Sequence, residues 1–335
     1  MNKKSVEIQF NWMLVLVAGT AIILFFAAVV VKQKNVSEIS AKATILKSVE
    51  SIIASTSISS DTISIVDIPN IDIDVACDKV SIGGASKQYQ KLVLFAPSLI
   101  RGDRLITQTL TFNAPYRATN FLYMTSPKVR YIIIGTNDLA KEVNRTLPIE
   151  LKKEFYSSVP LLKSSDNYKV KFVFFDSADL NNIDLKNFEK MRNVDVTAIL
   201  IIGDGSKGEV DFYQKDGIFW ALKAKSAYLG KAPLIGAINT DTFEAYKCNM
   251  QNSFSRLDLV TKIYIERTKE LEKAAKANGQ VQCEQVYKNS LSSLNRISAA
   301  VSDFSNANVD DIVDAANSLA SENNNAQIYS CTLIY

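Results

Sequence analysis

Hydrophobic and polar positions divide the 335-residue chain into stretches with different periodicities. The first is an uncharged run from Met13 to Val31. At about 1.5 Å per residue it forms a helix of roughly 28 Å, close to the thickness of the hydrocarbon core of a bilayer. Apolar residues then recur at three- and four-residue steps as far as Ile53, before a Ser/Thr-rich segment. We therefore predict a membrane anchor within residues 1–34 and an amphipathic stalk helix over residues 35–55.

Beyond the stalk, the pattern indicates an α/β protein. Short strands separated by turn residues predict a small β-rich segment over residues 56–127. From residue 128, continuous apolar strands alternate with helical stretches, which is typical of a parallel sheet covered on both faces. We expect a Rossmann-like or flavodoxin-like three-layer domain over residues 128–247. Its elements include a helix ending near LKKEFYSSV (151–159) and a further strand at PLIGAI (233–238).

The last part of the chain is predicted to be helical. Amphipathic periods predict helices over 255–277, 286–304 and 309–319, within a helical C-terminal region over residues 248–335. Their apolar stripes are expected to pack on the sheet or on one another.

The composition excludes several classes of function without identifying one. The chain contains 0 histidines, which excludes Ser-His-Asp triads, Cys-His dyads and His-ligated zinc. The net charge of +3, from 38 basic and 35 acidic residues without a basic stripe, gives no reason to expect nucleic acid as a partner. Gly203, Gly205 and Gly208 spell GxGxxG, but a hairpin pattern follows where a dinucleotide site needs a helix. We predict no metal and no cofactor, and any enzyme in this chain must use carboxylates, Lys, Tyr or Ser.

Polar residues follow the predicted parallel strands at the edge where open α/β sheets bind ligands. The same residue types are required there as helix caps and turn residues, so a ligand site and a purely structural role both remain open. The candidates for ligand binding are Asn137, Asp138, Asp176, Asp179 and Asp204.

Four cysteines too far apart for a CxxC site indicate disulfides or buried thiols. An unbroken helix of roughly 35 Å between Cys248 and Cys283 would hold these two apart, whereas the last helices return Cys331 towards Cys283. We predict the pairs Cys283–Cys331 and Cys77–Cys248. Paired cysteines favour placing the C-terminal bulk outside the cytoplasm.

The N-terminal segment KKSVEIQFNWM resembles the processing region of archaeal prepilins. That motif has Gln first, Ser third, Glu fifth and an apolar residue ninth; here Ser5, Glu7, Gln9 and Met13 stand at those places. The resemblance implies cleavage between Lys4 and Ser5, although Gln9 cannot supply the carboxylate of the fifth position. An uncleaved anchor is the alternative, and a cleaved signal peptide is disfavoured because no small-x-small site follows the apolar run.

The segments PYRATNFLYMTSP, DFYQK, GAINTDTFEAYKCNM and SCTLIY, together with the anchor, resemble a group of uncharacterised single-pass archaeal membrane proteins. The resemblance implies an archaeal cell-envelope protein and brings no known activity. We expect a single-pass protein of the cell membrane that acts in surface architecture, pilus-like assembly or adhesion. Its expected partners are the lipid bilayer, further copies of itself or other envelope proteins. The alternative is a tethered enzyme or solute-binding domain that uses the strand-end carboxylates.

Overall fold

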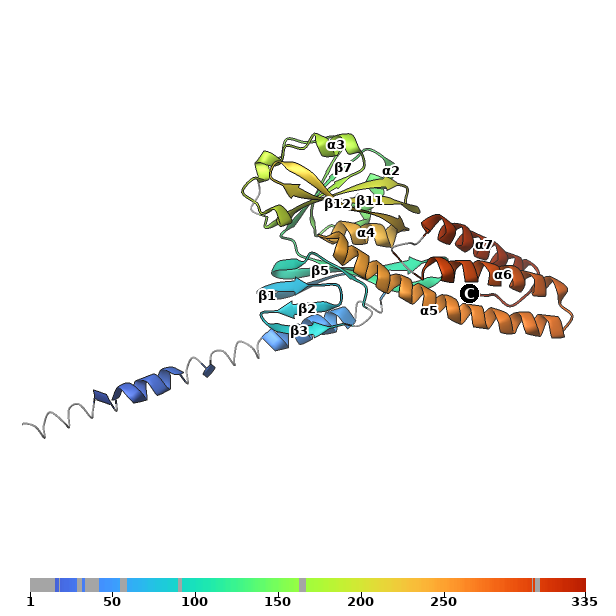
Figure 1. Cartoon of the computed structure of the whole chain (residues 1–335), viewed down its shortest axis with the longest axis horizontal. Helices are drawn as coiled ribbons and strands as arrows, with labels where there is room; N and C mark the ends of the chain where they lie inside the picture. Colours follow the sequence, from blue (N-terminus) through green and yellow to red (C-terminus); the bar gives the residue numbers. More distant parts are fainter. Residues whose placement is uncertain are drawn as a thin grey trace, which may run out of the picture.

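The structure is a computed structural model of the chain. It describes residues 16–17, 19–28, 32–33, 42–54, 59–89, 92–162, 167–302, 304 and 308–335. The body is a mixed α/β fold with two sheets, from which a helical bundle extends to one side and the N-terminal segment to another (Figure 1).

The first sheet contains six strands, nearly all antiparallel, in the order β3-β2-β1-β5-β6-β4; β4 alone runs parallel to its neighbour β6. The alternating apolar positions of the sequence favour such strands, because successive side chains of a strand point to opposite faces of the sheet. The strands are β1 (Ile63–Val75), β2 (Lys79–Ile82), β3 (Ala85–Gln88), β4 (Leu94–Phe95), β5 (Leu99–Asn113) and β6 (Arg117–Thr125).

The second sheet also has six strands, in the order β12-β11-β10-β9-β7-β8. Its first four strands in the chain are parallel, and two hairpins then add the antiparallel strands β11 and β12 at one edge. The strands are β7 (Val129–Ile134), β8 (Lys152–Tyr156), β9 (Lys169–Phe174), β10 (Val196–Gly203), β11 (Lys207–Asp216) and β12 (Phe219–Leu229).

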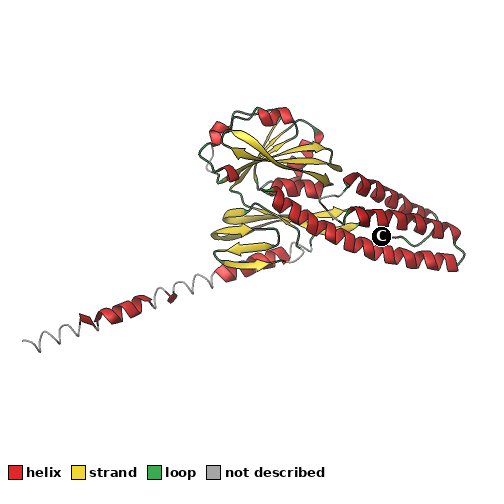
Figure 2. Cartoon of the chain, in the orientation of Figure 1, coloured by secondary structure: helices red, strands yellow, loops and turns green. Residues whose placement is uncertain are grey.

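Helices cover both faces of the second sheet and form the bundle (Figure 2). The α-helices are α2 (Asp138–Thr146), α3 (Ser177–Asn181), α4 (Lys231–Asn239), α5 (Phe243–Ala277), α6 (Val281–Ala300) and α7 (Val309–Ile328), and the 3₁₀ helices are η1 (Leu185–Phe188) and η2 (Asn193–Asp195). The parallel sheet covered on both faces is therefore present.

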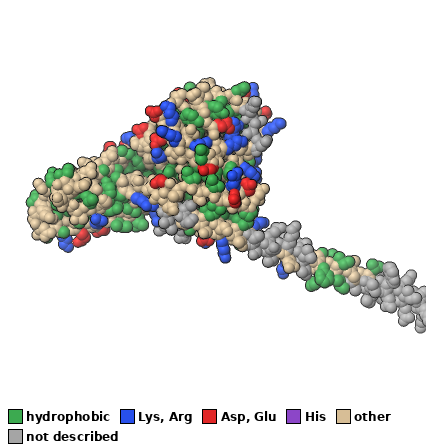
Figure 3. Space-filling view, turned by 180° about the vertical axis from the view of Figure 1, so that it is seen from behind, with side chains coloured by type: hydrophobic (Ala, Val, Ile, Leu, Met, Phe, Trp, Pro, Cys, Tyr) green, Lys and Arg blue, Asp and Glu red, His purple; other side chains and the backbone are tan. Residues whose placement is uncertain are grey.

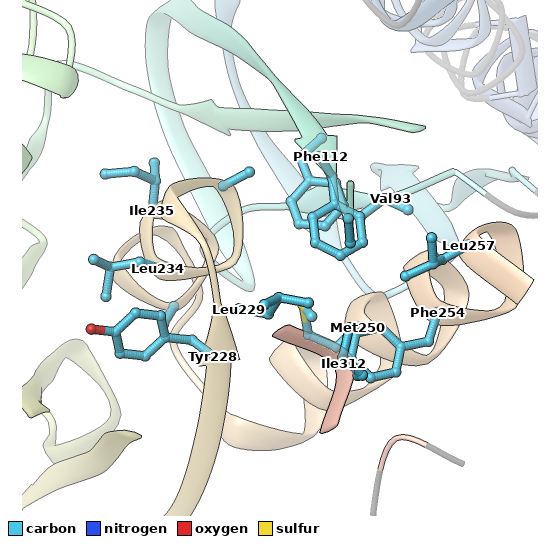
Figure 4. Close-up of a cluster of buried hydrophobic side chains, with 14 of the residues drawn as sticks. Val93, Phe112, Tyr228, Leu229, Leu234, Ile235, Met250, Phe254, Leu257 and Ile312 are labelled. Atoms are coloured by element: carbon cyan, nitrogen blue, oxygen red, sulfur yellow. The ribbon is translucent and has the colours of Figure 1, made fainter. Parts of the chain in front are cut away.

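The main hydrophobic core lies between the two sheets, with α4 and the first half of α5 inside it (Figure 4). Leu234 and Ile235 of α4 are fully buried there, together with Phe112 of the first sheet. Gly236 lets α4 approach the first sheet closely, since a Cβ at this position would stand 2.9 Å from the ring of Phe95. The two sheets thus share one core.

A second core covers the outer face of the first sheet. Residues 42–54 are helical, and Leu46, Val49 and Ile53 of this helix pack against that face. Val49 is fully buried, so the predicted amphipathic stripe of the stalk is used as a docking face.

Two local predictions were wrong. PLIGAI lies in α4 and not in a strand, because a short apolar run buried on all sides fits a helix held between two sheets as well as a buried strand. The segment at LKKEFYSSV contains β8, whereas the preceding helix α2 ends at Thr146. Leu147 ends that helix with extended backbone angles, directly before Pro148.

The predicted anchor lies only partly within the described residues. Of the run from Met13 to Val31, residues 16–17 and 19–28 are described, and they are helical. Among the residues that the structure describes, no helix is both long and apolar enough to cross a membrane.

Both predicted disulfides are present. Cys77, in the turn between β1 and β2, is bonded to Cys248 in α5. Cys283, in the first turn of α6, is bonded to Cys331 beyond the end of α7. The geometric argument holds although α5 begins twelve residues earlier than the period at 255–277 indicates, because Cys248 and Cys283 still lie near opposite ends of one long helix.

Candidate functional site

Two of the predicted site residues cap the helices that follow their strands. The side chain of Asn137 accepts a hydrogen bond from the backbone N–H of Ala140 at 2.8 Å, which caps α2. Asp176 accepts one from the N–H of Ala178, also at 2.8 Å, and caps α3. Both oxygens satisfy N–H groups that a helix start leaves free.

Two further predicted residues lie in the first turns of the same helices. Asp138 is almost fully exposed, and its ion pair with Lys141 at 3.0 Å holds the pKa of its carboxyl below the ordinary value. Partial burial, together with the charge of Asp176, raises the pKa of Asp179. Negative charge in the first turn of a helix favours the helix itself, without a ligand.

Asp204 closes the turn between β10 and β11. Its Oδ1 accepts hydrogen bonds from the backbone N–H groups of Ser206, at 2.7 Å, and Lys207, at 3.0 Å. The hydroxyl of Ser206 and these two N–H groups lower the pKa of Asp204. Two glycines of the GxGxxG stretch are required by the same turn: Gly203 has a φ of +133°, and a Cβ at Gly208 would stand 2.2 Å from the carbonyl oxygen of Ile202.

A groove of about 900 Å³ lies beside this turn, between the ends of β10 to β12 and the start of α7. Its charged side chains are paired: Lys207 with Asp310, and Lys225 with Glu209 at 3.2 Å. The face in Figure 3 likewise shows basic and acidic side chains interspersed over the sheets, with fewer charges on the bundle. The groove has room for a small polar solute, but its paired charges do not select for one sign of charge.

The structure does not assemble the predicted residues into one site. Asp176 and Asp179 are near each other, but no hydrogen bond or ion pair among the described residues links the groups at Asp138, Asp176 and Asp204. The described part of the chain also holds no group of three or more Cys, Asp or Glu side chains able to bind a metal. Lys4 and Ser5, the predicted processing site, lie outside the described residues.

A buried ionic cluster, which the sequence did not reveal, joins the two sheets. Asp241, between α4 and α5, is contacted by Lys169 of β9 and lies 2.8 Å from Nζ of Lys171 of the same strand. Its Oδ2 also accepts hydrogen bonds from the N–H and hydroxyl of Ser98, at 2.8 and 2.9 Å, beside the first sheet. All three charged side chains are at most 4% exposed.

Burial and the neighbouring charges shift the pKa values of two members of the cluster. Burial lowers the pKa of Lys171 to about 8, although the charge of Asp241 opposes this effect. Burial alone would raise the pKa of Asp241, but Lys171 and Lys169 outweigh it and lower the value to about 2. Lys171 also donates to the carbonyl oxygens of Asn239 and Thr240, at 3.0 and 2.7 Å.

This cluster lies at the amino end of β9, away from the carboxyl edge where α/β sheets bind ligands. A lysine with a pKa near 8 is a chemically competent base or nucleophile, but Lys171 is buried and engaged by three acceptors. The arrangement therefore fastens the two sheets to each other. One signal in the sequence could have indicated this cluster: two lysines lie in the otherwise apolar strand KVKFVF. If such a strand is entirely buried, the charges of its lysines need a buried partner of opposite charge.

Comparisons with protein-family models, with curated proteins and with solved structures gave no match to this chain.

Proposed function

We propose that this is a cell-envelope protein whose N-terminal apolar helix is held in a membrane, with the two-sheet body outside the cytoplasm. Its role is architectural: copies assemble at the surface, in the manner of a pilin or of an anchored scaffold. The observation that carries the proposal is the exposure of large apolar side chains in the described helical residues 16–17 and 19–28.

The described part of that segment carries large apolar side chains that face solvent. Their exposed fractions lie between 56% and 69%. The residues are Leu16, Val17, Ile22, Ile23, Leu24, Phe25 and Phe26. Burying one such side chain stabilises by about 1.5–3 kcal/mol, so seven correspond to roughly 10–20 kcal/mol that only a membrane or other helices can supply.

Two features of the body support the same interpretation. The helix at 42–54 packs on the outer face of the first sheet, and the described helical residues 19–28 lie away from the body (Figure 1). The two disulfides favour a compartment outside the reducing cytoplasm. The described residues 19–28 are helical and apolar, and the amphipathic helix at 42–54 docks on a sheet; both features support the likeness to a pilin stalk.

Membrane attachment is tested by fractionating cells that express the full chain. We expect the protein in the membrane pellet after a high-salt wash and its release by detergent. Leu24→Arg should move it towards the soluble fraction, because a charge at the centre of a span costs about 2.5–3.5 kcal/mol. Leu161→Arg is the matched control, since Leu161 is 93% exposed on the body. A wild-type chain found in the soluble fraction would contradict the proposal.

Processing is tested by the intact mass of the protein extracted from membranes. Loss of residues 1–4 would establish cleavage before Ser5 and favour filament assembly. A full-length mass would leave a plain uncleaved anchor.

A second candidate function is a tethered enzyme or solute binder. The parallel strand order β8-β7-β9-β10 supports a flavodoxin-like interpretation, because the strand order reverses between β7 and β9. Asn137 and Asp176 follow these two strands, so a ligand would bind beside them. A thermal-shift screen of the detergent-solubilised full chain against metals and nucleotides tests this candidate. A stabilisation of several degrees that Asp176→Asn removes would favour it over the architectural role.

A further inference from the structure

A second cavity adjoins the groove beside the β10–β11 turn. This β12 cavity has a volume of about 350 Å³ and is lined by residues of β12, of the starts of α5 and α7, and by Phe304. It adjoins the groove because the two share the lining residues Lys225, Ser226, Ala227 and Val309. Its volume falls in the range of about 300–1,000 Å³ that is usual for sites of small molecules.

Two phenylalanine side chains give the β12 cavity apolar walls. The ring of Phe243, in the first turn of α5, lies 5.8 Å from that of Phe212. The ring of Phe304 lies 5.3 Å from that of Phe254. Phe212 and Phe254 are both buried in the main core, so the core holds the two walls in place. An apolar group between these walls would be removed from water, which favours binding.

The unbalanced charge of the β12 cavity comes from Lys247. This half-buried residue lies four positions beyond Phe243, on the same face of α5. Its ammonium group has no ion pair or hydrogen bond with any residue that the structure describes. Lys225, the other lysine of the lining, is already paired with Glu209 at 3.2 Å and with Asp211 at 2.9 Å. No carboxylate is among the described lining residues, so the cavity favours a negative charge.

The free edge of β12 adds backbone donors to the same cavity. The N–H of Gly230 donates to the carbonyl of Ser206 at 2.6 Å, so residues 230 and 206 form a hydrogen-bonded pair between β12 and β11. Such pairs alternate along an antiparallel ladder. The N–H groups of Lys225 and Ala227 therefore point away from β11, towards the free edge that the cavity borders.

The acceptors of this edge are less available than its donors. The hydroxyl of Ser226 donates to the carbonyl oxygen of Ala227 at 3.2 Å. A peptide that added a further strand to β12 would need this carbonyl as well as the N–H groups. A carboxylate needs donors alone, because it can only accept hydrogen bonds. The edge therefore favours a free acid over a peptide strand.

We propose that the β12 cavity binds a small organic acid with an apolar or aromatic body. Its carboxylate accepts hydrogen bonds from the ammonium group of Lys247 and from the free N–H groups of β12, and its body lies between Phe243 and Phe304. The site differs from the strand-end residues Asn137 and Asp176 of the second candidate function. It also does not depend on the proposed membrane attachment.

The experiment is a ligand-observed NMR titration of the detergent-solubilised full chain with 3-phenylpropanoate. The matched probes are 3-phenylpropanamide and 3-phenylpropylamine, which keep the same body and replace the carboxylate by a neutral or a cationic group. We expect saturable binding of the acid with a Kd in the millimolar range, as is usual for a ligand of this size. The amide and the amine should bind at least about tenfold more weakly. Equal affinity for all three probes would overturn the proposal, and so would an acid that shows no saturation.

Variants of two lysines locate the binding site. Lys247→Gln should weaken binding of the acid by about tenfold or more, and Lys247→Arg should restore most of it. Lys223→Gln is the matched control, because Lys223 is an exposed lysine of β12 that does not line the cavity. We expect it to leave binding unchanged. Equal losses from Lys247→Gln and Lys223→Gln would show a general attraction by surface charge and would overturn the proposal. The urea midpoint of each variant, measured alongside, separates loss of binding from loss of the fold.

Discussion

Replacing Asp241 by Asn removes one negative charge from the buried cluster while nearly preserving its shape. Asn keeps an oxygen for the two donors of Ser98, so neither a cavity nor a lost backbone bond complicates the result. Lys169 and Lys171 remain, each at most 3% exposed, without a counter-charge. Removing one partner of a buried ion pair costs about 3–5 kcal/mol.

An independent argument gives the same magnitude. A buried lysine without a counter-charge is expected to lose its proton. At pH 7, about 3.4 units below the ordinary lysine pKa, this costs about 5 kcal/mol, which sets a ceiling for the loss of one counter-charge. At pH 9 the same ceiling falls to about 2 kcal/mol. The destabilisation by Asp241→Asn should therefore shrink as the pH rises.

The assay is urea unfolding of the detergent-solubilised full chain at pH 7 and pH 9, followed by circular dichroism. Asp138→Asn is the matched control, because Asp138 also pairs with a lysine but is exposed, and we expect no measurable change from it. The reasoning is refuted if Asp241→Asn costs less than about 1 kcal/mol at pH 7, or if its cost is the same at both pH values.

Three further outcomes follow from the same geometry. Burial lowers the pKa of Lys171 to about 8, so between about pH 8 and about pH 10 the unfolded chain binds more protons than the folded chain. The free energy of unfolding should therefore rise with pH in this window. Lys171→Met should flatten that slope in urea titrations. Gly208→Ala should destabilise by about 3 kcal/mol. Gly205→Ala, whose Cβ would meet Glu142 Oε2 at 3.4 Å and Leu139 Cδ1 at 4.0 Å, should change the urea midpoint little; equal effects would contradict the turn packing. Cys248→Ser opens the disulfide to Cys77, which closes a loop with a sequence separation of 171, and should lower the free energy of unfolding by about 2–5 kcal/mol; an unchanged midpoint would show that the bond adds nothing.

The disulfide pairing was predictable because one rigid helix decided it. A helix from before Cys248 to near Cys283 holds these residues apart, which excludes their pairing with each other, and the last helices return Cys331 to Cys283, which leaves Cys77 for Cys248. The parallel strands were predictable from their own composition. A continuous apolar run such as VRYIII has to be buried on both faces, which is typical of a parallel sheet covered by helices.

The elements that the sequence did not predict depend on neighbours that are distant in the chain. PLIGAI is apolar at every position except its glycine, and only the arrival of both sheets makes it a helix with no exposed side. Asp241 lies 72 residues beyond Lys169, and at its own position it looks like an ordinary residue before a helix. Its burial depends on Ser98 and the first sheet closing over it, which no local pattern reports.

The strand-end carboxylates show how far the candidate site could be predicted from the sequence. Asp176 and Asp204 were predictable as polar residues at the right edge of the sheet. Whether such an oxygen faces a ligand or its own backbone is decided within two or three residues, by turn geometry. Here Ala178 and Ser206 supply the N–H groups, and both carboxylates bond to the backbone.

The positions of the two disulfides determine how the chain would carry a mechanical load. Tension between the N-terminal helix and the C-terminal residues would run through β1 to Cys77 and cross to Cys248. It would then follow α5 to Cys283 and cross to Cys331. The second sheet lies entirely within the first bypassed loop, so it would remain folded and unloaded while the chain is pulled at its two ends.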